Sequence, residues 1–195
     1  LESGTRVVVM RDRGGVGAAL EEKLAALGVS VLSVGGAPSS EELLGHLQAF
    51  AAGGPIHGVY WLCAADVEPS ELDAAGWREE LRVRVKLLAD GMRALYEAIA
   101  PRGTFLVAAT RLGGCHGYDE AGAVAPMGGA VTGFVKAYKR EREAALVKAV
   151  DLAADVGAEL AAERLIAETL SDPGAVEIGY DGAQRVTIAL EEIEP

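Results

Sequence analysis

The sequence predicts an α/β protein in which a mainly parallel, doubly wound sheet lies between two layers of helices. Three observations support this fold class. Short runs rich in β-branched residues alternate with longer segments of helical periodicity along the whole chain. The first run, Arg6–Met10, is almost continuously apolar, as strands buried on both faces are. A glycine-rich turn follows this run directly and leads into a helix.

The first half of the chain is expected to contain three strands and two helices. Residues 16–27 carry apolar side chains at helical spacing and stop at Gly28, which suits a helix C-terminus. Ser40 can cap a second helix, whose first turn is acidic. The three strands are predicted at Arg6–Met10, Ser30–Val34 and residues 57–62. These five elements complete a βαβαβ unit.

The second half is expected to begin with one long helix over residues 72–100, because its apolar positions fall on one stripe. Those positions are Trp77, Leu81, Val85, Leu88, Met92 and Leu95. The next elements are a strand at 104–109, a helix within 125–142, a strand at 146–150 and a helix near Ala158–Leu170. Strands at 176–180 and 186–190, joined by Asp181-Gly182, indicate an antiparallel pair. Residues 1–195 suit a single domain.

Composition limits the possible partners and the compartment. The formal net charge is −11, which argues against nucleic acid and anionic membrane surfaces, since both attract basic proteins. Cys63 and Cys115 are too few and too far apart for a metal or redox motif, so two free thiols are expected. No apolar run reaches the ~18 residues of a membrane span, and no signal-peptide pattern opens the chain. We therefore expect a cytoplasmic protein.

The turn after the first strand has the position of a dinucleotide-binding loop but only part of its composition. Such loops use glycines so that main-chain N–H groups can approach a pyrophosphate at a helix N-terminus. Part of that pattern is preserved by Gly14, Gly15 and Gly17. Arg11 replaces an opening glycine, and Asp12 adds a carboxylate that would repel phosphate. The second strand also ends without the acid or base that reads a ribose. We therefore expect a Rossmann-like domain whose vestigial loop binds no cofactor.

Other chemically capable residues form no recognisable site in the sequence. Cys115 and His116 could be a nucleophile and its base, but sequence neighbours seldom face each other. Thr110 ends the fourth predicted strand, where a local hydrogen bond is a commoner role than catalysis. The three histidines, His46, His57 and His116, lack metal-ligand spacing. No catalytic residue and no metal site are predicted.

Residues 125–142 resemble the active-site helix of short-chain dehydrogenases, in which a Tyr-x-x-x-Lys motif precedes a run of small residues. The similarity rests on Ala130-Val131-x-Gly133-Phe134 and Arg140-Glu141. On this alignment Val124 stands at the tyrosine position and Gly128 at the lysine position. Neither side chain can donate or hold a proton. The resemblance therefore implies the fold of that superfamily with a degenerate cofactor loop and without its proton-transfer residues.

Nearly the whole chain is similar to the ketoreductase region of modular polyketide synthases and polyunsaturated fatty acid synthases. The motifs behind this resemblance are Gly14-Gly15-Val16-Gly17, Gly58-Val59-Tyr60-Trp61, Trp77-x-x-x-Leu81-x-Val83-x-Val85-Lys86, Ala109-Thr110-Arg111-Leu112-Gly113 and Gly128-Gly129-Ala130-Val131-x-Gly133-Phe134. Such a region has two similar halves, a structural subdomain with a degraded nucleotide site and a catalytic subdomain that binds NADPH. This chain resembles the structural subdomain.

The resemblance implies a scaffold that supports NADPH-dependent β-ketoacyl reduction by a catalytic half outside this chain. Its partners would be that catalytic subdomain and the acyl carrier protein of the same megasynthase. The family associates through helices that correspond to residues 72–100 and 128–142, which predicts a homodimer of the isolated chain with Val131 on its outward side. Two alternatives stay open. One is a free-standing NADPH-dependent reductase that uses Thr110, Tyr118 and Lys136, and the other is an independent pseudoenzyme that serves as an interaction module.

Overall fold

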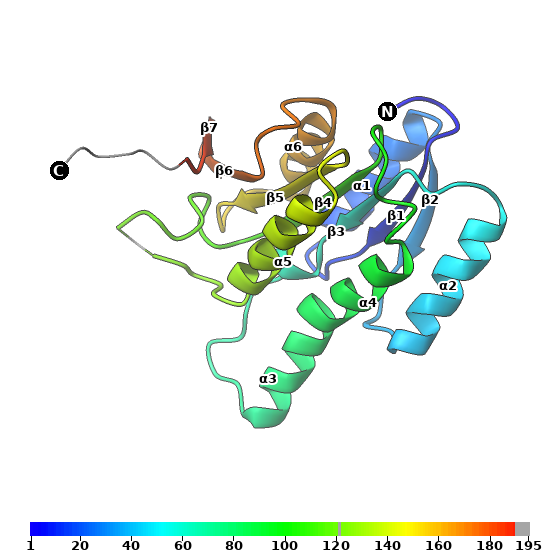
Figure 1. Ribbon diagram of the computed structural model, residues 1–195. Helices are drawn as coiled ribbons and strands as arrows, with labels where there is room; N and C mark the ends of the chain where they lie inside the picture. The colour runs from blue at the N-terminus through cyan, green and yellow to red at the C-terminus, as the bar shows by residue number, and fades with distance from the viewer. Residues whose placement is uncertain (121, 190–195) are drawn as a thin grey trace.

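A computed structural model describes residues 1–120 and 122–189, in which strands and helices alternate along the chain (Figure 1). The strands are β1 (Arg6–Met10), β2 (Ser30–Val34), β3 (Gly58–Trp61), β4 (Phe105–Thr110), β5 (Leu146–Leu152), β6 (Glu177–Asp181) and β7 (Gln184–Thr187). The α-helices are α1 (Val16–Ala26), α2 (Ser40–Ala52), α3 (Ala74–Leu81), α4 (Leu87–Ala94), α5 (Gly128–Glu141) and α6 (Ala158–Leu170). A 3₁₀ turn, η1 (Cys63–Ala65), follows β3, and a π-helical segment, η2 (Arg82–Lys86), joins α3 to α4.

The seven strands form one sheet in the order β2-β1-β3-β4-β5-β6-β7. All neighbouring pairs are parallel except β6 and β7, which are antiparallel. Helices α1 and α6 cover one face, and α2, α4 and α5 cover the other (Figure 1). The predicted fold class, a three-layer sandwich around a mainly parallel and doubly wound sheet, is confirmed.

Two apolar clusters, one on each face of the sheet, hold the layers together. On the first face, Val16, Leu20 and Leu24 of α1 are fully buried, at the four-residue spacing of one helix face. On the second face, Leu43 and Leu47 of α2 pack beside α4. Every residue of β3 and β4 is buried, which explains why these strands read as continuous apolar runs.

The N-terminus of α2 differs by one residue from the sequence prediction. Ser39, rather than Ser40, is the N-cap residue. Its hydroxyl accepts a hydrogen bond from the main-chain N–H of Glu42, and its own N–H donates to the Glu42 carboxylate at 2.8 Å. This reciprocal pair is a capping box, so the first turn of α2 is satisfied from both directions.

The predicted long helix over residues 72–100 is wrong in its bounds and in its buried face. The helix is interrupted by η2, in which the Arg84 side chain is fully buried. The main-chain carbonyl of Arg84 accepts a hydrogen bond from the Trp61 indole at 2.9 Å. A π-turn adds a residue to the helical repeat, so the apolar stripe is not continuous through it. Trp77, before the interruption, is 44% exposed, whereas Leu88 and Met92 after it are buried.

The antiparallel pair at the end of the sheet is confirmed, but its turn lies at Gly182 and Ala183, one residue later than predicted, because Asp181 still belongs to β6 and pairs with Gln184. Its second strand, β7, begins at Gln184 and ends at Thr187, earlier than the predicted 186–190. The predicted last residue, Leu190, lies outside the described residues. Within the part of the chain that the structure describes, no helix combines the length and the hydropathy needed to cross a membrane.

Candidate functional site

The strand order reverses between β1 and β3, and open α/β sheets bind ligands beside the carboxyl ends of the strands at such a point. A cavity of about 310 Å³ lies there. Its charged lining consists of Arg11, Asp12, Arg13, Asp66, Glu79 and Glu80. Four carboxylates against two guanidinium groups make this cavity a poor environment for a pyrophosphate.

Asp12 occupies the N-terminus of α1 from inside the chain. Its buried carboxylate accepts hydrogen bonds from the main-chain N–H groups of Val16 at 3.1 Å and Gly17 at 2.7 Å. Gly15 precedes the helix at φ 94°, a left-handed conformation that favours glycine. The sequence predicted that Asp12 would repel a phosphate. In the structure the carboxylate also takes the two amides that a phosphate would use.

Asp66, just after η1, occupies the preceding part of the same loop. Its Oδ1 atom accepts hydrogen bonds from the main-chain N–H groups of Arg13 at 2.7 Å and Gly14 at 3.2 Å. The Arg13 side chain returns to Asp66 Oδ2 at 3.1 Å and reaches Glu80 at 3.1 Å. Sequence reasoning missed Asp66. The available signal was an acid shortly after β3, the strand that lies beside β1 in a doubly wound sheet.

Arg111 lies beside the carboxyl ends of the same sheet, and its role was also not predicted from the sequence. Its guanidinium donates to the carbonyls of Ala65, Ala153, Ala154 and Val156 at 2.7 to 3.1 Å. These carbonyls belong to η1 and to the segment after β5. One side chain therefore ties together two loops at the carboxyl ends of the strands, where a ligand crossing the sheet would lie.

The positions aligned with a catalytic tyrosine and lysine carry no proton-transfer group. Val124 is 57% exposed. Gly128 begins α5 and packs so tightly that an added Cβ would lie 3.2 Å from the Cβ of Thr110 and 3.3 Å from the Leu112 side chain. A lysine at this position would require both neighbours to move.

Thr110 is not available as a substrate-orienting hydroxyl. The side chain is fully buried, and its hydroxyl donates to Asp151 at 2.8 Å. Asp151 is itself fully buried at the end of β5 and accepts three further bonds, from the main-chain N–H groups of Leu112 and Gly114 at 2.6 Å and of His116 at 2.9 Å. This carboxylate fixes the loop after β4.

The cysteines and the remaining histidines do not form the sites considered from sequence. Cys63 and Cys115 are free thiols. Burial raises the pKa of Cys63 to about 12, and burial together with nearby carboxylates raises the pKa of Cys115, so neither environment favours a thiolate. His57 accepts a hydrogen bond from the Arg6 main chain at 3.0 Å. The described residues contain no cluster of side chains suited to a metal.

A cavity of about 230 Å³ brings together two of the three residues weighed for an atypical reductase. Tyr118 and Lys136 both line it, together with His116, whereas Thr110 does not belong to its lining. Lys136 forms an ion pair with Glu177 at 2.8 Å. The structure therefore places the tyrosine and the lysine beside one cavity but separates them from the buried threonine.

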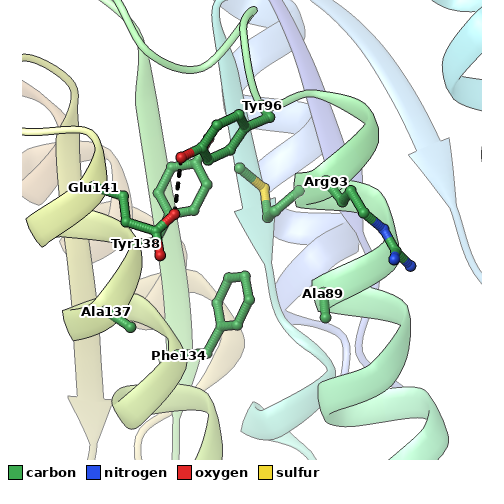
Figure 2. A pocket seen from close by; sticks show the side chains of 8 residues that line it. Ala89, Arg93, Tyr96, Phe134, Ala137, Tyr138 and Glu141 are labelled. Atoms are coloured by element: carbon green, nitrogen blue, oxygen red, sulfur yellow. Dashed lines mark hydrogen bonds between the residues drawn. The ribbon is translucent and has the colours of Figure 1, made fainter.

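An apolar groove of about 290 Å³ lies between α4 and α5 on the outer face of the helical layer. Figure 2 shows Phe134, Ala137 and Tyr138 of α5 opposite Ala89 and Arg93 of α4. Tyr96 closes one end by donating a hydrogen bond to Glu141 at 2.9 Å (Figure 2).

The expected outward position of Val131 is wrong. The side chain is fully buried against the sheet, because Val131 and Val135 share the inner face of α5. Ala137 is exposed and lines the groove, so Ala137, and not Val131, belongs to the outer face of α5.

The sequence matches no protein-family model and no curated protein. Solved structures share its fold. A short-chain dehydrogenase/reductase from Brucella melitensis has a TM-score of 0.70 at 13% identity, covering 90% of this chain and 95% of the other. One from Serratia marcescens has a TM-score of 0.68 at 13% identity, covering 90% and 96%. A Burkholderia cenocepacia short-chain dehydrogenase in complex with NADP has a TM-score of 0.68 at 16% identity, covering 88% and 92%. The chain therefore has the short-chain dehydrogenase/reductase fold.

Proposed function

We propose that this chain is the non-catalytic, structural half of a ketoreductase of the short-chain dehydrogenase type. In this role it supports NADPH-dependent β-ketoacyl reduction by a catalytic half outside the chain, to which an acyl carrier protein delivers the substrate. The observation that carries the proposal is the loop after β1, whose amides bond to Asp12 and Asp66. The fold shared with reductases and the apolar residue at Val124 add support.

A dinucleotide would have to displace both carboxylates to reach the loop. Its pyrophosphate would find no free donor among the main-chain N–H groups of Arg13, Gly14, Val16 and Gly17, because each already donates to a carboxylate. It would also face negative charge at close range, in a partly buried setting where screening by water is weak. Charge repulsion and the lack of free N–H donors both weaken the binding of a dinucleotide.

We expect the isolated chain to show no measurable binding of NADPH or NADH in calorimetric titration. The Burkholderia cenocepacia protein, whose structure contains NADP, is the positive control under the same conditions. Saturable binding of NADPH with a dissociation constant in the low micromolar range would contradict the proposal.

A free-standing reductase is the second candidate, because Tyr118 and Lys136 line one cavity. This function also requires NADPH, since the hydride must come from the nicotinamide. Oxidation of NADPH by the isolated chain with a β-ketoacyl thioester, lost in Tyr118→Phe, would favour it. The scaffold role predicts that the chain alone leaves NADPH unchanged.

The groove between α4 and α5 is the surface that we assign to the catalytic half. The groove is lined mainly by aromatic and apolar side chains (Figure 2), and apolar surfaces of this kind commonly mark protein interfaces. Phe134 and Tyr138 stack with ring centroids 6.0 Å apart, which gives the groove a preformed wall. In the isolated chain a second copy would cover the same face.

Ala137→Arg is expected to convert a dimer of the isolated chain into a monomer. The long side chain would fill the groove, while Glu141 one turn later can pair with it and preserve the helix. Sedimentation velocity measures the change, and Ala51→Arg on the exposed side of α2 is the matched control. A monomer before any substitution, at high protein concentration, would contradict the interface assignment.

A further inference from the structure

Helix α3 forms part of the wall of the cavity between β1 and β3, which we call the switch-point cavity. Glu79 and Glu80 of its last turn line this cavity together with Arg13 and Cys63. The helix extends beyond the sheet (Figure 1), and each of its described residues is exposed or half-buried. An element without a buried apolar face can open locally at a small cost in free energy. The position of α3 therefore depends on a few side-chain contacts.

The π-helical segment η2 provides a hinge at the base of α3. Helices bend at π-turns, where the regular hydrogen-bond repeat is broken. The segment itself is fixed to the domain by its contact with Trp61, whose indole donates to the carbonyl of Arg84 at 2.9 Å. It is also fixed by the Arg82 guanidinium, which donates to the carbonyls of Pro38 at 2.6 Å and Ala37 at 3.0 Å. A movement of α3 would therefore pivot at η2.

One carboxylate connects the last turn of α3 to the loop after β1. Glu80 accepts hydrogen bonds from Arg84 Nε at 2.8 Å and from the Arg13 guanidinium at 3.1 and 3.3 Å. Burial alone would raise the pKa of Glu80, but the hydrogen bonds from these two side chains outweigh it and lower the pKa below its ordinary value, so the carboxylate is charged at neutral pH. Arg13 lies 67 residues earlier in the chain, so its contact with Glu80 joins two separate elements.

The two ion pairs of Glu80 differ in strength and in the segments that they join. Arg84 lies one turn further along the same helical stretch, and its side chain is fully buried. The Arg13 side chain is 68% exposed, and ion pairs with an exposed partner contribute little because water screens them. Opening of α3 need break only the weaker pair, while the buried guanidinium keeps its carboxylate.

We infer that α3 is a lid over the switch-point cavity, hinged at η2 and latched to the loop after β1 by the ion pair of Glu80 with Arg13. The Arg13 side chain also donates to Asp66 at 3.1 Å, so the latch joins α3 to one of the carboxylates that fill the loop. Opening of the lid widens the cavity and uncovers Cys63. The inference does not rest on the proposed function, since it uses only contacts within the chain.

The thiol of Cys63 can report the opening of this lid. Cys63 lines the switch-point cavity and is only 2% exposed, and Cys115 is the second free cysteine. In a Cys115→Ser background, the modification of Cys63 by methyl methanethiosulfonate, a small neutral reagent, is followed by mass spectrometry. The rate should hardly change at low urea concentrations, because lid opening exposes little surface, whereas modification through global unfolding would accelerate steeply with urea.

Arg13→Met removes the latch and keeps most of the apolar stem of the side chain. It should accelerate the modification of Cys63 about threefold, as the loss of a partly exposed ion pair allows, and leave the free energy of unfolding nearly unchanged. Hydrogen exchange of the amides at 77–81 should accelerate in parallel, and exchange in α4 should not. Arg11→Met is the matched control and should leave both rates unchanged, because Arg11 lines the same cavity but pairs with Glu21 of α1 at 3.7 Å.

Three results would overturn the lid. The first is modification of Cys63 with the same urea dependence as global unfolding, or no modification short of global unfolding. The second is an equal acceleration in Arg13→Met and Arg11→Met, which would show that any change in the cavity lining exposes the thiol. The third is faster modification in Arg13→Met without faster exchange at 77–81, since the thiol would then become accessible while α3 stays in place.

Discussion

Replacing Glu168 with alanine is expected to lower the free energy of unfolding by about 3–5 kcal/mol. Lys148 and Glu168 have fully buried side chains and form an ion pair at 2.7 Å. Glu168 also accepts hydrogen bonds from Tyr180 at 2.6 Å and from Arg185 at 2.6 and 3.0 Å. Removing this carboxylate leaves the Lys148 ammonium group in the interior without its counter-charge, which is why the expected loss exceeds that of a surface pair.

Chemical denaturation measures the loss, and Glu163→Ala is the matched control on the same helix. Glu163 is 60% exposed and pairs with Lys23, so its removal should change the free energy of unfolding by at most about 1 kcal/mol. Equal effects of the two substitutions would show that the buried cluster contributes little.

The pH dependence provides a second test of the same carboxylate. Burial alone would raise the pKa of Glu168, but hydrogen bonds from Arg185, Lys148 and Tyr180 outweigh it and lower the pKa to about 2 from an ordinary value of 4.5. A lowered pKa stabilises the fold in full above pH 4.5, and this contribution is lost as the pH falls towards 2. The stability of Glu168→Ala should therefore fall less over this range than that of the original chain.

Asp151→Ala is expected to destabilise the chain by about 3 kcal/mol or more. The substitution leaves the buried N–H groups of Leu112 and Gly114 and the hydroxyl of Thr110 without their acceptor, and each such loss costs about 1–3 kcal/mol. Hydrogen exchange at Leu112 and Gly114 should accelerate by more than the global loss of stability predicts, since the loop after β4 loses its anchor.

Asp155→Ala is the control for Asp151, because Asp155 lies on the exposed segment after β5. Its removal should change the free energy of unfolding by at most about 0.5 kcal/mol. It should not change the hydrogen exchange of the loop amides. Protection of Leu112 and Gly114 that survives in Asp151→Ala would mean that another contact holds the loop.

Most strands of the sheet could be predicted from the sequence, because they are buried on both faces and therefore appear as apolar runs. It failed at the helix before β4, where the buried Arg84 and its π-turn break the repeat on which helix prediction relies. It also misplaced Val131, although the four-residue spacing from Val131 to Val135 was available as a sign that both face the sheet.

The candidate site was predictable only where its contacts are local. Asp12 bonds to amides four and five residues away, and the sequence marked it as an obstacle to phosphate. Asp66 and Arg111 act on segments more than forty residues distant, so their roles depend on the packing of whole strands and loops. The cavity lined by Tyr118 and Lys136 likewise is formed by residues from three separate segments, namely the loop after β4, α5 and the start of β6.

The carboxylates in the loop after β1 also affect how the chain responds to its surroundings. A reductase that binds its nucleotide is stabilised by it, and this stabilisation rises with the logarithm of the nucleotide concentration. Here the anion is part of the polypeptide, so its local concentration is constant. The melting temperature of this chain should therefore be the same with and without nucleotide, and the stability of the domain should not depend on the nucleotide concentration around it.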